Sequence, residues 1–125
     1  MSLAVSIRET GGVKVLDVVG RITLGEGASI LRETLRTMAR ESHKKILVNL
    51  EEASYIDSSG LGVLVSGFAG ITSHGGQFKL LNLTNRIRDL LLITKLFTVF
   101  EVFDSETAAI NSFIEVESET SSAHP

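Results

Sequence analysis

The sequence predicts an α/β fold in which helices pack against a mixed β-sheet. One observation is an N-terminal pair of alternating or β-branched runs separated by Gly11-Gly12, which is typical of an antiparallel hairpin. The other is the order that follows, in which helical and strand patterns alternate up to a final helix. Because such alternation produces parallel crossovers, we expect the hairpin and the later strands to share one sheet.

The first elements follow from apolar periodicity. A strand over residues 3–7 is expected to pair with a strand at Val13 to Val19, and Gly20 to Gly25 then interrupts the pattern. A helix is predicted over Glu26 to Glu41, with an acidic residue near its start and a basic residue near its end, as the helix dipole favours. Lys45 to Leu50 is an apolar run typical of a strand covered on both faces.

The central helix is predicted over Ser58 to Ser73, because one face carries apolar residues at helical spacing. These residues are Leu61, Leu64, Val65, Phe68 and Ile71 or Thr72. Gly75-Gly76 is expected to end this helix, since glycine is the usual left-handed residue after a helix. Phe78, Leu80 and Leu81 then indicate another strand.

The last elements are shorter. Thr84 can cap a helix whose buried positions are Ile87, Leu90 and Leu91. A strand around Val99 to Val102 is expected next. Asp104 or Ser105 is then expected to cap a final helix.

Length and composition indicate one domain. The chain has 125 residues, of which 43% are hydrophobic and 22% are charged, as in ordinary globular proteins. We expect the domain to span residues 1–116. Residues 117–125 are mostly Ser, Thr and Glu and end in Ala123, His124 and Pro125, and we predict that they form a disordered polar tail.

Charge and residue usage limit the kinds of partner that we expect for this protein. The net charge of -3 argues against nucleic acid, and the absence of cysteine and the scattered His43, His74 and His124 argue against a metal. The most apolar stretch, Leu90 to Phe100, is too short to cross a membrane and contains Lys95, so we expect no membrane insertion. Without a recognisable leader, the expected location is the cytoplasm.

The strand-to-helix turn Asp57-Ser58-Ser59-Gly60-Leu61-Gly62 contains the most informative residues. The first N–H groups of a helix lack intrahelical partners, and the helix dipole adds partial positive charge there. Such a turn can hold or receive a phosphate. From the residues alone, Asp57, Ser58 and Ser59 can equally be simple helix caps, so both interpretations stay open.

Two enzyme interpretations of this turn are disfavoured. Gly60-Leu61-Gly62 lacks both the Gly-Lys-Ser/Thr of a P-loop and a third glycine at dinucleotide-binding spacing, so no cofactor is expected. A hydrolase nucleophile elbow needs glycine two residues before and two residues after the serine; Gly60 meets the second requirement for Ser58, but Ile56 occupies the first position. We therefore predict a protein that is not an enzyme.

The chain resembles the STAS domain family, and within it the single-domain anti-sigma factor antagonists. The resemblance covers Met1 to about Ile114. It is carried by Asp57-Ser58-Ser59-Gly60-Leu61-Gly62 after Ile46-Leu47-Val48-Asn49-Leu50, and by Leu80-Leu81-Asn82-Leu83 and Ile93-Thr94-Lys95-Leu96-Phe97. It implies a STAS-type mixed sheet.

The resemblance also implies a function. Ser58 would be phosphorylated by a partner that is both anti-sigma factor and serine kinase; the unphosphorylated form would bind this partner and release a sigma factor, and a phosphatase would reset the switch. The implied contact surface comprises Asp57, Ser59, Gly60, Leu61, Gly20, Arg21, Ile22 and Thr23. Thr23 stands where the family often has an acidic residue that contacts the kinase, so the partner's identity stays open.

A second function is consistent with the same residues. The chain can be a non-switching accessory or scaffold subunit of a transporter or signalling complex, in which Ser58 is only a helix cap. Arg86 and Arg88 can border the binding face in either case, because their helix follows the strand beside the central turn. The sequence leaves the oligomeric state open.

Overall fold

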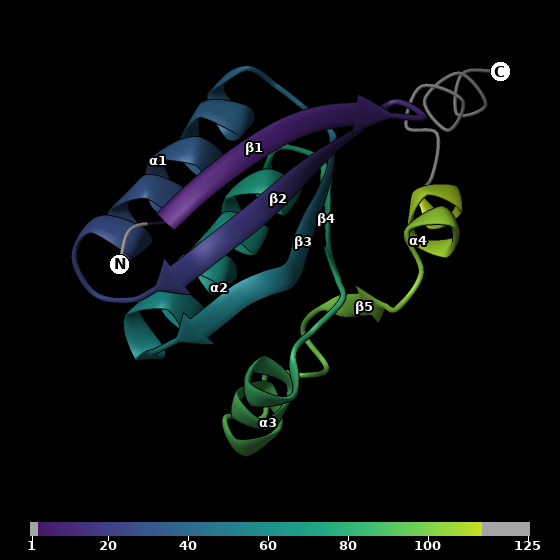
Figure 1. Cartoon of the computed structure of the whole chain (residues 1–125). Coiled ribbons are helices and arrows are strands. Elements are labelled where there is room, and N and C mark those ends of the chain that lie inside the picture. The colour runs from purple at the N-terminus through teal and green to yellow at the C-terminus, as the bar shows by residue number, and fades with distance from the viewer. Residues whose placement is uncertain (1–2, 114–125) are drawn as a thin grey trace, which may run out of the picture.

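The structure, a computed structural model, describes residues 3–113. Its strands are β1 (Leu3–Thr10), β2 (Val13–Ile22), β3 (Lys45–Ile56), β4 (Gln77–Leu81) and β5 (Glu101–Phe103). They form one sheet in that order (Figure 1). β1 and β2 are antiparallel, whereas every later neighbouring pair is parallel. The predicted mixed sheet with an N-terminal hairpin is therefore confirmed. The predicted tail and the domain boundary at 116 lie outside the described residues.

The helices are α1 (Glu26–Arg40), α2 (Ser58–Ser73), α3 (Asn85–Ile93) and α4 (Glu106–Ser112). α1 and α2 lie side by side on one face of the sheet (Figure 1), where the main core gathers around residues such as Leu31, Val48 and Leu64. A smaller core that includes Val15 and Ala109 packs α4 on the opposite face, because adjacent strand residues point to opposite sides. No helix within residues 3–113 is long and apolar enough to span a bilayer.

Local caps account for most helix boundaries. The Oγ1 of Thr84 accepts a hydrogen bond from the backbone N–H of Ile87 at 3.2 Å, and Ser105, not Asp104, caps α4. α1 begins at Glu26 as predicted and ends one residue before the predicted boundary. Gly75, with φ of 82°, adopts the left-handed conformation just after α2. The sequence signals for these helices are therefore confirmed.

Several strand boundaries were wrong. β1 runs to Thr10 instead of residue 7, and β2 runs through Gly20 to Ile22 instead of ending at Val19. β3 continues to Ile56 instead of ending at Leu50, and because its last pair with β4 joins Asn49 to Leu81, its second half pairs only with β2. β5 begins at Glu101 instead of Val99. The reason is that the backbone N–H of Val99 donates to the carbonyl of Leu96 at 3.0 Å, so the chain still turns at Val99 and first pairs with β4 at Glu101.

The long β3 determines where the Asp57 turn lies. Parallel β2 and β3 end together, since Ile22 pairs with Ile56 in the last register position. α3 packs beside the part of β3 that extends past β4. The loop after β2, the start of α2 and the helix α3 therefore meet at one edge of the sheet, the carboxyl edge where open α/β proteins usually bind ligands (Figure 1).

Candidate functional site

Asp57 is the residue that organises this edge. It is the N-cap of α2, and its Oδ1 accepts a hydrogen bond from the backbone N–H of Gly60 at 2.9 Å. Its Oδ2 accepts another from the backbone N–H of Leu24, also at 2.9 Å. One carboxylate therefore fixes the start of α2 and the loop between β2 and α1. Of the three residues that could have been the cap, only Asp57 takes that role.

These hydrogen bonds also change the acidity of Asp57. The backbone N–H of Leu24 and then that of Gly60 stabilise the ionised form and hold the pKa of the carboxyl below its ordinary value, against a smaller opposing effect of burial. Asp57 is consequently a carboxylate at neutral pH, with both oxygens engaged. Its charge therefore helps to hold the turn in its conformation.

Asp57 should make the folding stability depend on pH. Because its pKa is lower in the folded state, the contribution is present above the unfolded pKa of about 3.9 and is lost as the pH falls through the folded value. Asp57→Asn keeps one acceptor oxygen as a cap and should cost about 1 kcal/mol at neutral pH. Urea unfolding of both proteins should show this difference shrinking below about pH 4; a constant difference would contradict the assignment.

Ser58 is the exposed functional group of the turn. It is the first residue of α2, and within residues 3–113 its hydroxyl has no hydrogen-bond partner. Ser59 is half-buried one residue further on. A hydroxyl at this place is accessible to an enzyme, and a phosphate attached to it would lie at the positive end of the helix.

The two segments expected to form the contact surface meet here. The backbone N–H of Asp57 donates to the carbonyl of Ile22 at 3.4 Å, so residues 20–23 lie directly against the turn. Ile22, Gly60 and Leu61, however, are buried, with Leu61 only 6% exposed. Arg21 is exposed, and Gly20 and Thr23 are half-buried. The buried residues support this surface from beneath, whereas the others reach solvent.

Leu24 was not found by sequence reasoning, although it is 79% exposed in the middle of this edge. The available signal was a leucine inside a glycine-bounded loop, Thr23-Leu24-Gly25, without an apolar partner at strand or helix spacing. On α3, Ile93 is 77% exposed. It borders a cleft that is also lined by Ile56, Arg86, Asp89 and Leu90. Apolar side chains therefore flank the serine turn.

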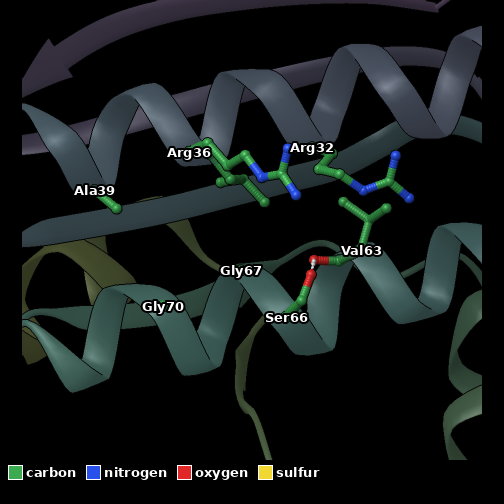
Figure 2. A pocket seen from close by; sticks show the side chains of 8 residues that line it. Arg32, Arg36, Ala39, Val63, Ser66, Gly67 and Gly70 are labelled. Carbon is green, nitrogen blue, oxygen red and sulfur yellow. Dashed lines mark hydrogen bonds between the residues drawn. The ribbon is translucent and has the colours of Figure 1, made fainter.

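A second concavity lies between α1 and α2, away from the turn. Figure 2 shows Arg32 and Arg36 extending from α1 across a groove whose other wall is formed by Val63, Ser66, Gly67 and Gly70 of α2. Arg36 is paired with Glu33 at 3.2 Å, and the hydroxyl of Ser66 donates to the carbonyl of Val63 in its own helix. Most polar groups of this groove are thus already satisfied within the domain.

The fold and the serine turn define a small α/β domain with an accessible hydroxyl at the carboxyl edge of a mixed sheet. A family model described as STAS domain matches residues 4–109. The chain therefore belongs to the STAS domain family, as its motifs indicated.

Known proteins are similar over most of the chain. An anti-sigma-B factor antagonist of Bacillus subtilis (strain 168) is 32% identical over 102 residues, which are 82% of this chain and 92% of the relative. The crystal structure of an anti-sigma factor antagonist from Mycobacterium paratuberculosis has a TM-score of 0.80 at 20% identity and covers 90% of this chain and 94% of that one. The Bacillus cell fate determinant SpoIIAA in its phosphorylated form has a TM-score of 0.69 at 22% identity, covering 86% and 97%. The two structures share the fold.

Proposed function

We propose that this protein is an anti-sigma factor antagonist switched by phosphorylation of Ser58. In its unphosphorylated form it binds an anti-sigma factor that is also a serine kinase, and this binding releases a sigma factor. A separate phosphatase restores the unphosphorylated form. The observation that carries the proposal is the exposed hydroxyl of Ser58 at the start of α2, which forms no hydrogen bond with residues 3–113, in a chain 32% identical to an anti-sigma-B factor antagonist.

The fold should tolerate the phosphate. A phosphoserine adds a charge of roughly -1.5 to -2 at neutral pH, and the start of α2 partly offsets that charge. Asp57 keeps its two backbone hydrogen bonds, because they point into the turn and toward Leu24 instead of toward Ser58. Phosphorylation would therefore change the surface of the turn and leave the sheet and core as they are.

The partner would be excluded by the same phosphate. A surface that packs against Ser58 and the exposed Leu24 would have to bury the doubly charged group or withdraw from it. The proposed contact surface consists of Gly20, Arg21, Thr23, Leu24, Asp57, Ser58 and Ser59. Ile22, Gly60 and Leu61 position these residues from beneath. The protein acts here as a binding module and a kinase substrate, without a catalytic role of its own.

Incubation with candidate anti-sigma factor kinases and ATP tests the proposal. We expect intact-mass analysis to show a single phosphate, and peptide mapping to place it on Ser58. Ser58→Ala should abolish the addition, whereas Ser59→Ala should retain it. A phosphate on Ser59 would contradict the assignment. Stable association with a membrane complex without any phosphate transfer would favour the accessory-subunit function instead.

A further inference from the structure

Tyr55 brings two arginines together beside the serine turn. The guanidinium carbon of Arg21 lies 4.9 Å from the centroid of the Tyr55 ring, and that of Arg86 lies 3.9 Å from it. Arg21 belongs to β2, where it is the register partner of Tyr55 on β3, and Arg86 belongs to the first turn of α3. Three elements thus place two positive charges around one aromatic ring.

Neither charge is paired with a carboxylate in the part of the chain that the structure describes. In the described range 3–113, no carboxylate lies within 4.0 Å of the guanidinium of Arg21 or Arg86. Asp89 lines the same cleft as Arg86 without forming an ion pair with it. By contrast, Arg8 pairs with Asp17 at 2.6 Å and Arg88 faces Asp104 at 3.7 Å. Arg21 and Arg86 therefore differ from Arg8 and Arg88, whose charges form ion pairs between elements of the fold.

Stacking on the ring of Tyr55 orients the two arginine side chains before an anion binds. A guanidinium held over an aromatic face keeps its N–H edge directed outward and loses less side-chain freedom when it binds an anion. Planar carboxylates fit that edge through two parallel hydrogen bonds. Arg21 and Arg86 are also both exposed, so an approaching protein can reach them.

We propose that Arg21 and Arg86, oriented by Tyr55, form a recognition site for a carboxylate-bearing patch on the protein that also contacts the Ser58 turn. This inference rests on the proposed function, and it names the charge of the partner surface. Partners with an acidic patch opposite this site are selected, and partners with a basic patch there are rejected by like-charge repulsion.

A first experiment needs no identified partner. Arginine side-chain N–H signals of the full chain are recorded by NMR while a hexaglutamate peptide is added at low salt. We expect the largest shifts at Arg21 and Arg86, and smaller ones at Arg40, an exposed arginine whose hydrogen-bond partner is the hydroxyl of Thr37. Hexaglutamine should shift none of them. Shifts at Arg21 and Arg86 no larger than at Arg40 would overturn the inference.

A second experiment uses the anti-sigma factor that binds the unmodified chain. Arg21→Gln and Arg86→Gln should each weaken binding about fivefold, and the double variant about twentyfold, with a smaller salt dependence. Arg40→Gln should bind like the wild type, because Arg40 lies at the end of α1 and bonds to the hydroxyl of Thr37. Circular dichroism should show that all variants are folded.

The outcomes separate this inference from the function on which it rests. If no anti-sigma factor binds the wild type, the proposed function fails, and the peptide titration alone decides the arginine site. If the wild type binds and the arginine variants bind equally well, the inference fails and the proposed function stands. A third outcome is that the variants bind the anti-sigma factor normally but shift the pKa of the Ser58 phosphate measured by ³¹P NMR. The two arginines would then interact with that phosphate instead of with a carboxylate of the partner, and the inference would be overturned.

Discussion

Ser58→Asp is expected to weaken binding of the anti-sigma factor about a hundredfold, which corresponds to about 3 kcal/mol. The substituted carboxylate lies on the surface that the partner covers, and burying it without a compensating group is costly. Ser58→Ala removes only the exposed hydroxyl and should bind like the wild type. A pull-down followed by calorimetric titration of the three proteins measures the difference.

The matched control is Ser66→Asp. It adds the same charge to the same helix, but Ser66 lies two turns further along α2, where its hydroxyl bonds to its own helix. This variant should bind as the wild type does. Thermal unfolding should also show that Ser58→Asp is folded, because an acidic residue in the first helical turn is favourable by about 0.3–1 kcal/mol. Equal recovery of the partner by all four proteins would exclude the switch.

Gly60→Ala is expected to cause the largest loss of folding stability, about 3 kcal/mol. A Cβ at this position would lie 2.1 Å from the carbonyl oxygen of Ile22 and 2.8 Å from side-chain atoms of Ile22 and Ile56. The turn would have to move away from β2, although alanine is otherwise the better helix former. Urea unfolding should show the loss, and anti-sigma factor binding should weaken because the Asp57 cap moves with the turn.

Gly62→Ala provides the comparison within the same helix. A Cβ there meets no atom within 4 Å, so the substitution should stabilise the protein by up to about 1 kcal/mol through helix propensity alone. Alanine is therefore expected to lower the folding stability at position 60 and to raise it at position 62. If Gly60→Ala were as stable as Gly62→Ala, the close approach of α2 to β2 would not be a constraint in solution.

Sequence patterns sufficed where a single segment contains its own signal. The limits of α1 and α2 follow from apolar periodicity and flanking glycines, and the hairpin follows from two runs around Gly11-Gly12. The second half of β3 has no such signal. It begins with the polar pair Glu51-Glu52, which does not look like a buried strand. It nevertheless pairs with β2 on one side, while α3 packs beside it.

Prediction of the functional site was limited in the same way. Asp57 and Ser58 could be found because they are neighbours in a family motif and at a helix start. Leu24 and the Arg21–Tyr55–Arg86 cluster could not, because their association depends on strand register and on the placement of α3. Apolar spacing correctly predicted that Leu61 lies on the buried face of α2, whereas the motif alone had placed the same residue on the contact surface.

The carboxylate of Asp57 joins two segments that are 33 positions apart in the sequence. One segment carries the exposed hydroxyl of Ser58, and the other carries the exposed side chain of Leu24. Because this carboxylate bonds to the backbone of Leu24 and not to its side chain, we expect substitutions of that side chain to change the surface that a partner meets while the Ser58 turn stays in place.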